Sequence, residues 1–188
     1  MMMILARRFY LFVIVCSVLG PDRTALAEGE MISLGSGKVQ LSAPEGWKVE
    51  QPRSRIVEAE LSIAAEEGDE QGGRVTIMSA GGTVEQNVER WIGQFTPSQG
   101  KTMKESVNRD TKKVAGVDVT IVDISGTFKD QPRGPFGPSV DRKDYRMLAA
   151  IIPTANSGNY YVKVTGPAKT IAANNEKFVK FIESLQLK

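Results

Sequence analysis

The sequence predicts an α+β domain in which helices pack on an antiparallel β-sheet. Most apolar segments alternate polar and apolar residues with the period of a β-strand, whereas two segments carry apolar residues at helical spacing. The predicted strands follow one another with short turns, which favours antiparallel pairing. The order is strands, helix, strands, helix, so we expect one sheet that is covered by helices.

The first 27 residues have the layout of a secretory signal peptide. Arg7 and Arg8 precede an apolar run over residues 9–20, and Ala25-Leu26-Ala27 ends the segment. The apolar run is shorter than the roughly 20 residues that a membrane span needs. We therefore expect cleavage after Ala27 and a periplasmic or secreted protein without a membrane span. Retention of the segment as an N-terminal anchor is the alternative.

Composition excludes several classes of function. The sequence has no His, and its one Cys, Cys16, lies inside the apolar run of the leader. Ser-His-Asp triads, Cys-His pairs and nearly all catalytic zinc sites are therefore excluded. Removal of residues 1–27 leaves 21 basic and 21 acidic residues, so no overall basic field would attract nucleic acid. We expect a single domain over residues 28–188 that holds no metal or other cofactor and is not an enzyme.

The first predicted strands are short. Residues 38–41 alternate polar and apolar, and a turn over residues 43–46 leads to a second strand at 47–49. Residues 56–65 and 74–80 are alternating and rich in β-branched side chains, which predicts a hairpin.

The loop that joins this hairpin is acidic, with Glu66, Glu67, Asp69 and Glu70. Calcium takes oxygen ligands from such loops, but the ligand spacing of an EF-hand is absent. We interpret the segment as a solvated hairpin tip, with calcium binding as the alternative.

A helix is predicted over residues 83–95. Starting at Val84, apolar residues recur at i, i+4, i+7, i+8 and i+11 and form one stripe. Thr83 and Gln86 have the spacing of a capping box, and Pro97 ends the helix. The glycines before Thr83 would allow an anion site at the helix start, but they match no phosphate-binding motif, so we favour a simple backbone turn.

The second half of the chain predicts a three-stranded meander and a final helix. The strands cover residues 117–128, 145–152 and 160–165, and the helix carries an apolar stripe from Ile171 to Leu185. The alternation changes phase near Ile121 and Val122, which indicates either a bulge or a strand covered on both faces.

These features resemble a known group of domains. Ala43-Pro44-Glu45-Gly46-Trp47 after a short strand, followed by the same order of elements, is similar to the PsbP-like superfamily. The resemblance implies an αβα sandwich with accessory or partner-binding functions and no shared catalytic centre. The segments Glu89-Arg90-Trp91-Ile92 and Asp144-Tyr145-Arg146-Met147-Leu148-Ala149 are similar to uncharacterised exported bacterial proteins.

The segment from Lys129 to Lys143 is the candidate binding region. It is predicted as a long loop with three prolines and two glycines, and loops of this length usually have a function. The candidate binding residues are Arg133, Phe136, Arg142 and Tyr145. We expect an exported non-catalytic accessory or binding protein whose partner is a protein or another envelope component. The alternative for the segment is a hairpin connection in which Phe136 folds back onto the sheet.

Two rival functions remain open. A cofactor-independent hydrolase would use Ser and Lys, or carboxylates paired across neighbouring strands, for which Glu58, Glu60, Asp118 and Asp123 are the candidates. Outward-facing carboxylates on a solvated sheet face are the simpler interpretation of these residues. A small-molecule carrier would need an aromatic or apolar pocket, and Trp47, Trp91, Tyr160 and Tyr161 are the candidates for it.

Overall fold

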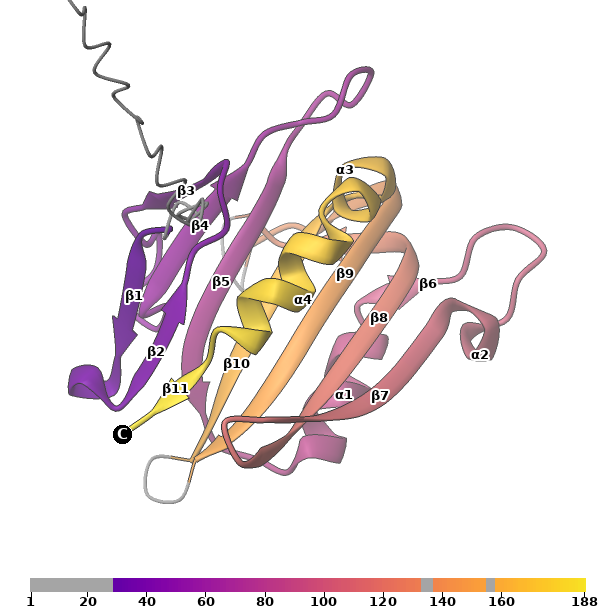
Figure 1. The fold of residues 1–188 in the computed structure, drawn as a ribbon. Helices are drawn as coiled ribbons and strands as arrows, with labels where there is room; N and C mark the ends of the chain where they lie inside the picture. Colours follow the sequence, from indigo (N-terminus) through magenta and orange to yellow (C-terminus); the bar gives the residue numbers. More distant parts are fainter. Residues whose placement is uncertain (1–28, 133–136, 155–157) are drawn as a thin grey trace, which may run out of the picture.

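The computed structural model describes residues 29–132, 137–154 and 158–188, and an eight-stranded antiparallel sheet dominates it (Figure 1). The strand order is β3-β4-β5-β10-β9-β8-β6, and β7 pairs with β8 beside β6. The strands of this sheet are β3 (Trp47–Glu50), β4 (Ala59–Ile63), β5 (Gly73–Ala80), β6 (Phe95–Thr96), β7 (Val107–Val114), β8 (Val117–Asp130), β9 (Val140–Thr154) and β10 (Gly158–Pro167).

A second, smaller sheet and four α-helices complete the described fold. The small sheet has the order β1-β2-β11 and consists of β1 (Met31–Leu34), β2 (Val39–Ser42) and β11 (Gln186–Leu187), with a 3-10 turn at Gly35–Gly37. The helices are α1 (Val84–Ile92), α2 (Met103–Ser106), α3 (Ala168–Ala173) and α4 (Asn175–Glu183). Figure 1 shows α4 crossing one face of the large sheet and α1 on the other face.

The two faces of the large sheet are both buried. Along β9, Leu148, Ala150 and Ile152 join the core under α3 and α4. The alternate residues of the same strand, Met147, Ala149 and Ile151, join a second core with Val88 and Trp91 of α1. This arrangement is the αβα sandwich that the sequence predicts, because side chains of a strand alternate between its two faces.

The predicted first helix is confirmed. Its capping box is formed, since Thr83 Oγ1 accepts a hydrogen bond from Gln86 N and Gln86 Oε1 accepts one from Thr83 N. The helix ends at Ile92, three residues before the predicted end, and Phe95 already belongs to β6. Each large side chain buried from its apolar stripe stabilises the fold by about 1.5–3 kcal/mol.

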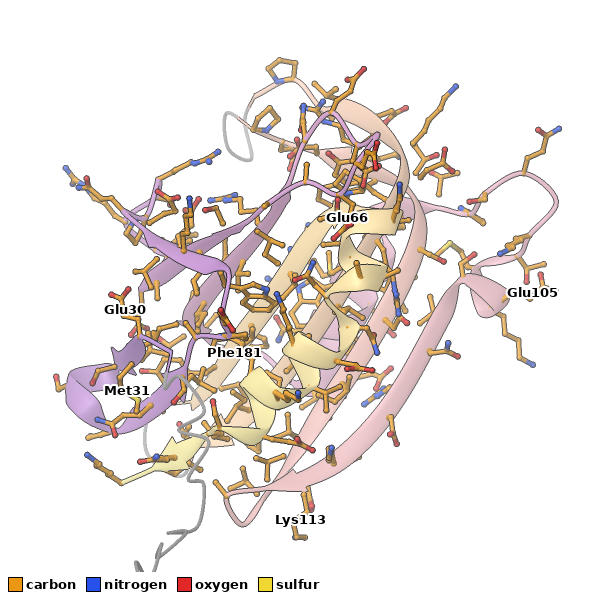
Figure 2. All side chains as sticks on the ribbon, turned by 45° about the horizontal axis from the view of Figure 1, so that its top comes forward. Glu30, Met31, Glu66, Glu105, Lys113 and Phe181 are labelled. Carbon is orange, nitrogen blue, oxygen red and sulfur yellow. The ribbon has the colours of Figure 1, made fainter. Side chains whose placement is uncertain are left out.

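Trp47, at the end of the segment Ala43-Pro44-Glu45-Gly46-Trp47, packs β3 against the C-terminal helices. Its indole Nε1 donates to Asn174 Oδ1 at 2.9 Å, and its ring meets that of Phe181 edge to face. Phe181, labelled in Figure 2, is fully buried on α4. The C-terminal helix predicted as one element is divided at Asn174 into α3 and α4.

One further strand prediction needs correction, and one of two alternatives for β8 is confirmed. The strand expected over residues 56–65 begins only at Ala59, and Ile56 is exposed. The phase change in β8 reflects burial on both faces, since Val119 and Val122 belong to different cores. The irregular register of β8 lies later, between Gly126 and Phe128.

The predicted long loop over residues 129–143 is wrong in its bounds. The β8–β9 ladder extends to the pair Asp130 and Val140, so Arg142 and Lys143 lie in β9. These strand ends are polar and project beyond the core, and they therefore lack the apolar alternation by which strands are recognised. No helix in the described ranges is long and apolar enough to cross a membrane.

Candidate binding groove

A groove of about 870 Å³ lies on the α1 face of the sheet, next to the part that α1 covers. Its floor comes from β4, β5, β10, β9 and β8, and its rim comes from the segments after β3, before β5 and after β8. The described side chains that line it are mainly polar: Arg53, Ser54, Ser62, Gln71, Arg74, Thr76, Asp130, Gln131, Arg142, Tyr145, Lys163 and Thr165. Four of them are basic and one, Asp130, is acidic.

One side of the groove is built on a buried carboxylate. Glu60 on β4 is 1% exposed and accepts two parallel hydrogen bonds from Arg74, at 2.8 and 2.9 Å. The same carboxylate accepts from the backbone N–H of Arg53, whose side chain lies 3.2 Å away. The hydrogen bonds from Arg74 hold the pKa of Glu60 below its ordinary value, and burial partly opposes them. One carboxylate therefore serves two guanidinium groups.

The other side is formed by the β8–β9 ends. Arg142 Nε lies 3.3 Å from Asp130 Oδ2, and both side chains are partly exposed. The ring of Tyr145 stacks on that of Phe128, and the Tyr145 hydroxyl hydrogen-bonds to Gln71 Oε1 at 3.2 Å. Burial raises the pKa of Tyr145, so its hydroxyl stays a neutral donor at physiological pH.

Lys163 lies in the middle of β10, between β5 and β9. Its Nζ donates to Gln94 Oε1 at 3.3 Å and lies 6.0 Å from the centre of the Trp91 ring. Burial, together with the positive charges of Arg74 and Arg90, lowers the pKa of Lys163 to about 8. Within the described residues, no carboxylate lies within 4 Å of this ammonium group and no Ser or Thr hydroxyl hydrogen-bonds to it.

The structure tests only part of the predicted binding set. Arg142 and Tyr145 both line the groove, on β9 rather than on a loop. Arg133 and Phe136 lie outside the described residues. Sequence reasoning did not select Arg53, Arg74 or Lys163. The available signal for Lys163 was its place between Val162 and Val164 in an apolar strand, which puts a cation alone on the opposite face.

The four candidate carboxylates do not form a pair across neighbouring strands. Three strands separate β4 from β8, which corresponds to about 19 Å, whereas glycosidase carboxylates lie about 5–9.5 Å apart. Each carboxylate has its own partner: Glu58 with Ser79, Glu60 with Arg74, Asp118 with Lys113, and Asp123 with Arg146. The interpretation of Glu60 as an outward, solvated side chain is wrong, because Arg74 and Arg53 bind it in a buried position.

The aromatic candidates also serve the fold. Trp47 and Tyr160 are buried in the core under α4, and Trp91 and Tyr161 are buried in the core under α1. They are therefore divided between opposite faces of the sheet and do not line one pocket.

The acidic loop is a solvated hairpin tip, with Glu66, Glu67 and Glu70 exposed, and Asp69 attaches it to α3. Asp69 Oδ2 accepts hydrogen bonds from the backbone N–H and the hydroxyl of Thr170, at 3.1 and 2.6 Å. Glu66, which Figure 2 shows beside α3, donates its backbone N–H to Thr170 Oγ1. Among the described residues, no group of three or more acidic side chains is placed to hold a metal ion.

Comparison with solved structures identifies the fold. Cyanobacterial PsbP (CyanoP) from Synechocystis sp. PCC 6803 superposes with a TM-score of 0.50 and 12% identity, over 90% of this chain and 99% of that chain. The fold is PsbP-like. LpqN, involved in cell envelope biogenesis of Mycobacterium tuberculosis, gives a TM-score of 0.46 and 9% identity, over 85% of this chain and 90% of that chain. No family model and no curated protein matches the sequence.

Proposed function

We propose that the protein is an exported, non-catalytic binding protein that recognises a component of the cell envelope through the groove on the α1 face. The observation that carries this proposal is the groove itself. Its volume of about 870 Å³ is within the range of ligand sites, and four basic side chains, a tyrosine and several hydroxyl and amide groups converge on it.

Export is supported by the leader-like sequence over residues 1–27, with its basic start, short apolar run and small residues before the expected cleavage position. The binding role is supported by the position of the groove. It lies on a rigid sheet, where Glu60 fixes Arg74, and Asp130 holds Arg142. The hydrogen-bond donors of such a site are already oriented before the ligand binds, so binding does not cost the entropy of ordering these side chains.

The arrangement offers little for the rival functions. A Ser-Lys hydrolase needs a hydroxyl held against the lysine amine, whereas the Nζ of Lys163 hydrogen-bonds to the amide of Gln94. A carrier of apolar molecules needs a large apolar cavity, whereas this groove presents polar and apolar side chains together, and the apolar pocket between α4, β8 and β9 has a volume of only about 200 Å³. Recognition of a polar partner is the role that the residues support best.

The test is capture of partners from the envelope fraction of the source cells. The protein is compared with the triple variant Arg53→Ala, Arg142→Ala, Tyr145→Phe, whose residues all line the groove, and with a control variant, Lys177→Ala, Lys180→Ala, on α4 at the opposite face. We expect the same captured species with the wild type and the control, and their loss with the triple variant at a nearly unchanged Tm.

Capture that survives in the triple variant, or that fails equally in the α4 control, would contradict recognition at the groove. A fall in Tm of the triple variant would instead indicate unfolding. In that case the single variant Arg142→Gln, which keeps a polar side chain opposite Asp130, replaces it in the same comparison.

A further inference from the structure

Lys163 is a cation that the described part of the chain holds with a neutral hydrogen-bond partner and without an ion pair. Its neighbours in β10, Val162 and Val164, are fully buried on the face that α3 and α4 cover. Because side chains alternate along a strand, Lys163 points to the opposite face, which carries α1. There Trp91 of α1 packs on Tyr161 of β10, and the groove lies next to the part of the sheet that α1 covers. The ammonium group therefore lies at the border between a hydrophobic core and an open groove.

Among the described residues, no carboxylate forms an ion pair with this ammonium group. Its hydrogen-bond partner, Gln94, is neutral, and the positive charges of Arg74 and Arg90 are close enough to lower its pKa. The Trp91 ring, at 6.0 Å, lies at the outer limit of cation–π attraction. A partly buried charge without a counterion is costly, because protein groups replace its water shell only in part.

The other charged side chains of the groove do not supply the negative charge that Lys163 lacks. Arg74 directs two of its donors to Glu60, and a guanidinium group has five N–H donors, so others remain for a ligand. Arg53 shares Glu60 with Arg74. With Glu60 counted together with the described lining residues, the groove has two positive charges more than it has negative ones.

Resting on the proposed binding function, we propose that the Lys163 end of the groove binds a phosphate or carboxylate group of the ligand, with Lys163 and Arg74 as its cationic contacts. An oxyanion at this position supplies the counterion that Lys163 lacks and accepts the remaining donors of Arg74. The groove is far larger than a single oxyanion needs, so the anionic group belongs to a larger molecule, whose other parts reach Tyr145 and Arg142.

The experiment follows the titration of Lys163 itself by NMR, in protein labelled with ¹³C at the lysine side chains. The pKa is measured in chloride and then, at equal ionic strength, with inorganic phosphate, with succinate, and with phosphatidylglycerol vesicles. At saturation we expect at least one of these probes to raise the pKa of Lys163 by one unit or more. One unit corresponds to about tenfold tighter binding to the ammonium form than to the amine form.

The three probes separate the sources of the group. A response to phosphate or succinate alone indicates a soluble anion, and a response to the vesicles alone indicates a lipid headgroup. No rise with any probe, or an equal rise at the exposed Lys180 on α4 at the opposite face, overturns the proposal. Lys163→Met should lose binding of the effective probe, and Lys180→Met should keep it; equal binding by both variants also overturns it.

This result is independent of partner capture. If the envelope partner is captured through the groove but no anion changes the pKa of Lys163, the proposed anion site is wrong and the proposed binding function is supported. If Lys163 responds to an anion while the triple variant captures partners as before, the anion site stands and recognition of the envelope component at the groove falls.

Discussion

Replacing Lys163 by Met should stabilise the protein in the absence of ligand. The pKa of Lys163 is about 8 in the folded chain, against an ordinary value of 10.5. Each unit of difference corresponds to about 1.4 kcal/mol, so below pH 8 the folded state carries a cost of about 3 kcal/mol for the charged amine. Methionine keeps a long unbranched side chain and removes the charge.

The sign of the pH dependence follows from proton binding. Between pH 8 and 10.5 the unfolded chain holds the proton on this lysine and the folded chain has lost it, so wild-type stability gains from Lys163 as pH rises through this window. The advantage of Lys163→Met should therefore be about 3 kcal/mol at pH 7 and approach zero near pH 10.5. Arg74, Arg90 and the other titrating groups are present in both proteins. The difference between the two free energies of unfolding therefore reports the contribution of Lys163.

Urea unfolding of both proteins at pH 7 and at pH 10.5 measures this difference. The reasoning is refuted if Lys163→Met is less stable than the wild type at pH 7, or if the difference between them is the same at both pH values. A change in the slope of the free energy of unfolding against urea concentration would show that the substitution changed the compactness of the folded or the unfolded state.

Three further outcomes are expected. Glu60→Gln should destabilise the protein by about 1–3 kcal/mol, because it weakens the charge-assisted hydrogen bonds from Arg74, while water can still solvate that guanidinium group, whose side chain is 45% exposed. The pKa of Glu60 is lowered in the folded chain, so the stability that Glu60 contributes is complete above pH 4.5 and is lost as pH falls below it. The free energy of unfolding should therefore fall less steeply with acid in Glu60→Gln than in the wild type. Trp47→Phe should cost about 1–3 kcal/mol in urea unfolding, because Asn174 Oδ1 loses its donor in a buried position, and an unchanged stability would refute this role. N-terminal sequencing of the exported protein should begin at Glu28, and recovery of residues 9–20 in that protein would show a retained anchor.

Sequence patterns predicted the elements that carry a clear apolar stripe or run, whether one face is buried, as in α1, or both faces, as in β9. The helix at Val84–Ile92 was predictable because its apolar stripe and its cap agree. The edge strand β7 was not predicted, because most of its residues, from Asn108 to Lys113, are exposed and show no alternation. The strand β11 was also missed, since its pairing with β2 brings together residues that are far apart in the sequence. The strand β1 pairs locally with β2 but has only four residues, too few for a clear alternation.

The groove was only partly predictable for a similar reason. Arg142 and Tyr145 were selected because they lie near a proline-rich segment, and both line the groove. Lys163 and Arg74 lie in strands whose alternation is clear, but the strand order β5-β10-β9, which places them together at the centre of the sheet, is a tertiary property. The burial of Glu60 was missed because its partner Arg74 lies on the adjacent strand β5.

The central claim is that the envelope component is recognised at the groove, and photo-cross-linking in the source cells tests it most directly. A photoreactive phenylalanine analogue is placed at Tyr145 in the groove and, in a second protein, at the exposed Lys180 on the opposite face. The account predicts a cross-linked species at position 145 that is absent at position 180. The same species from both positions, or from position 180 alone, would contradict it.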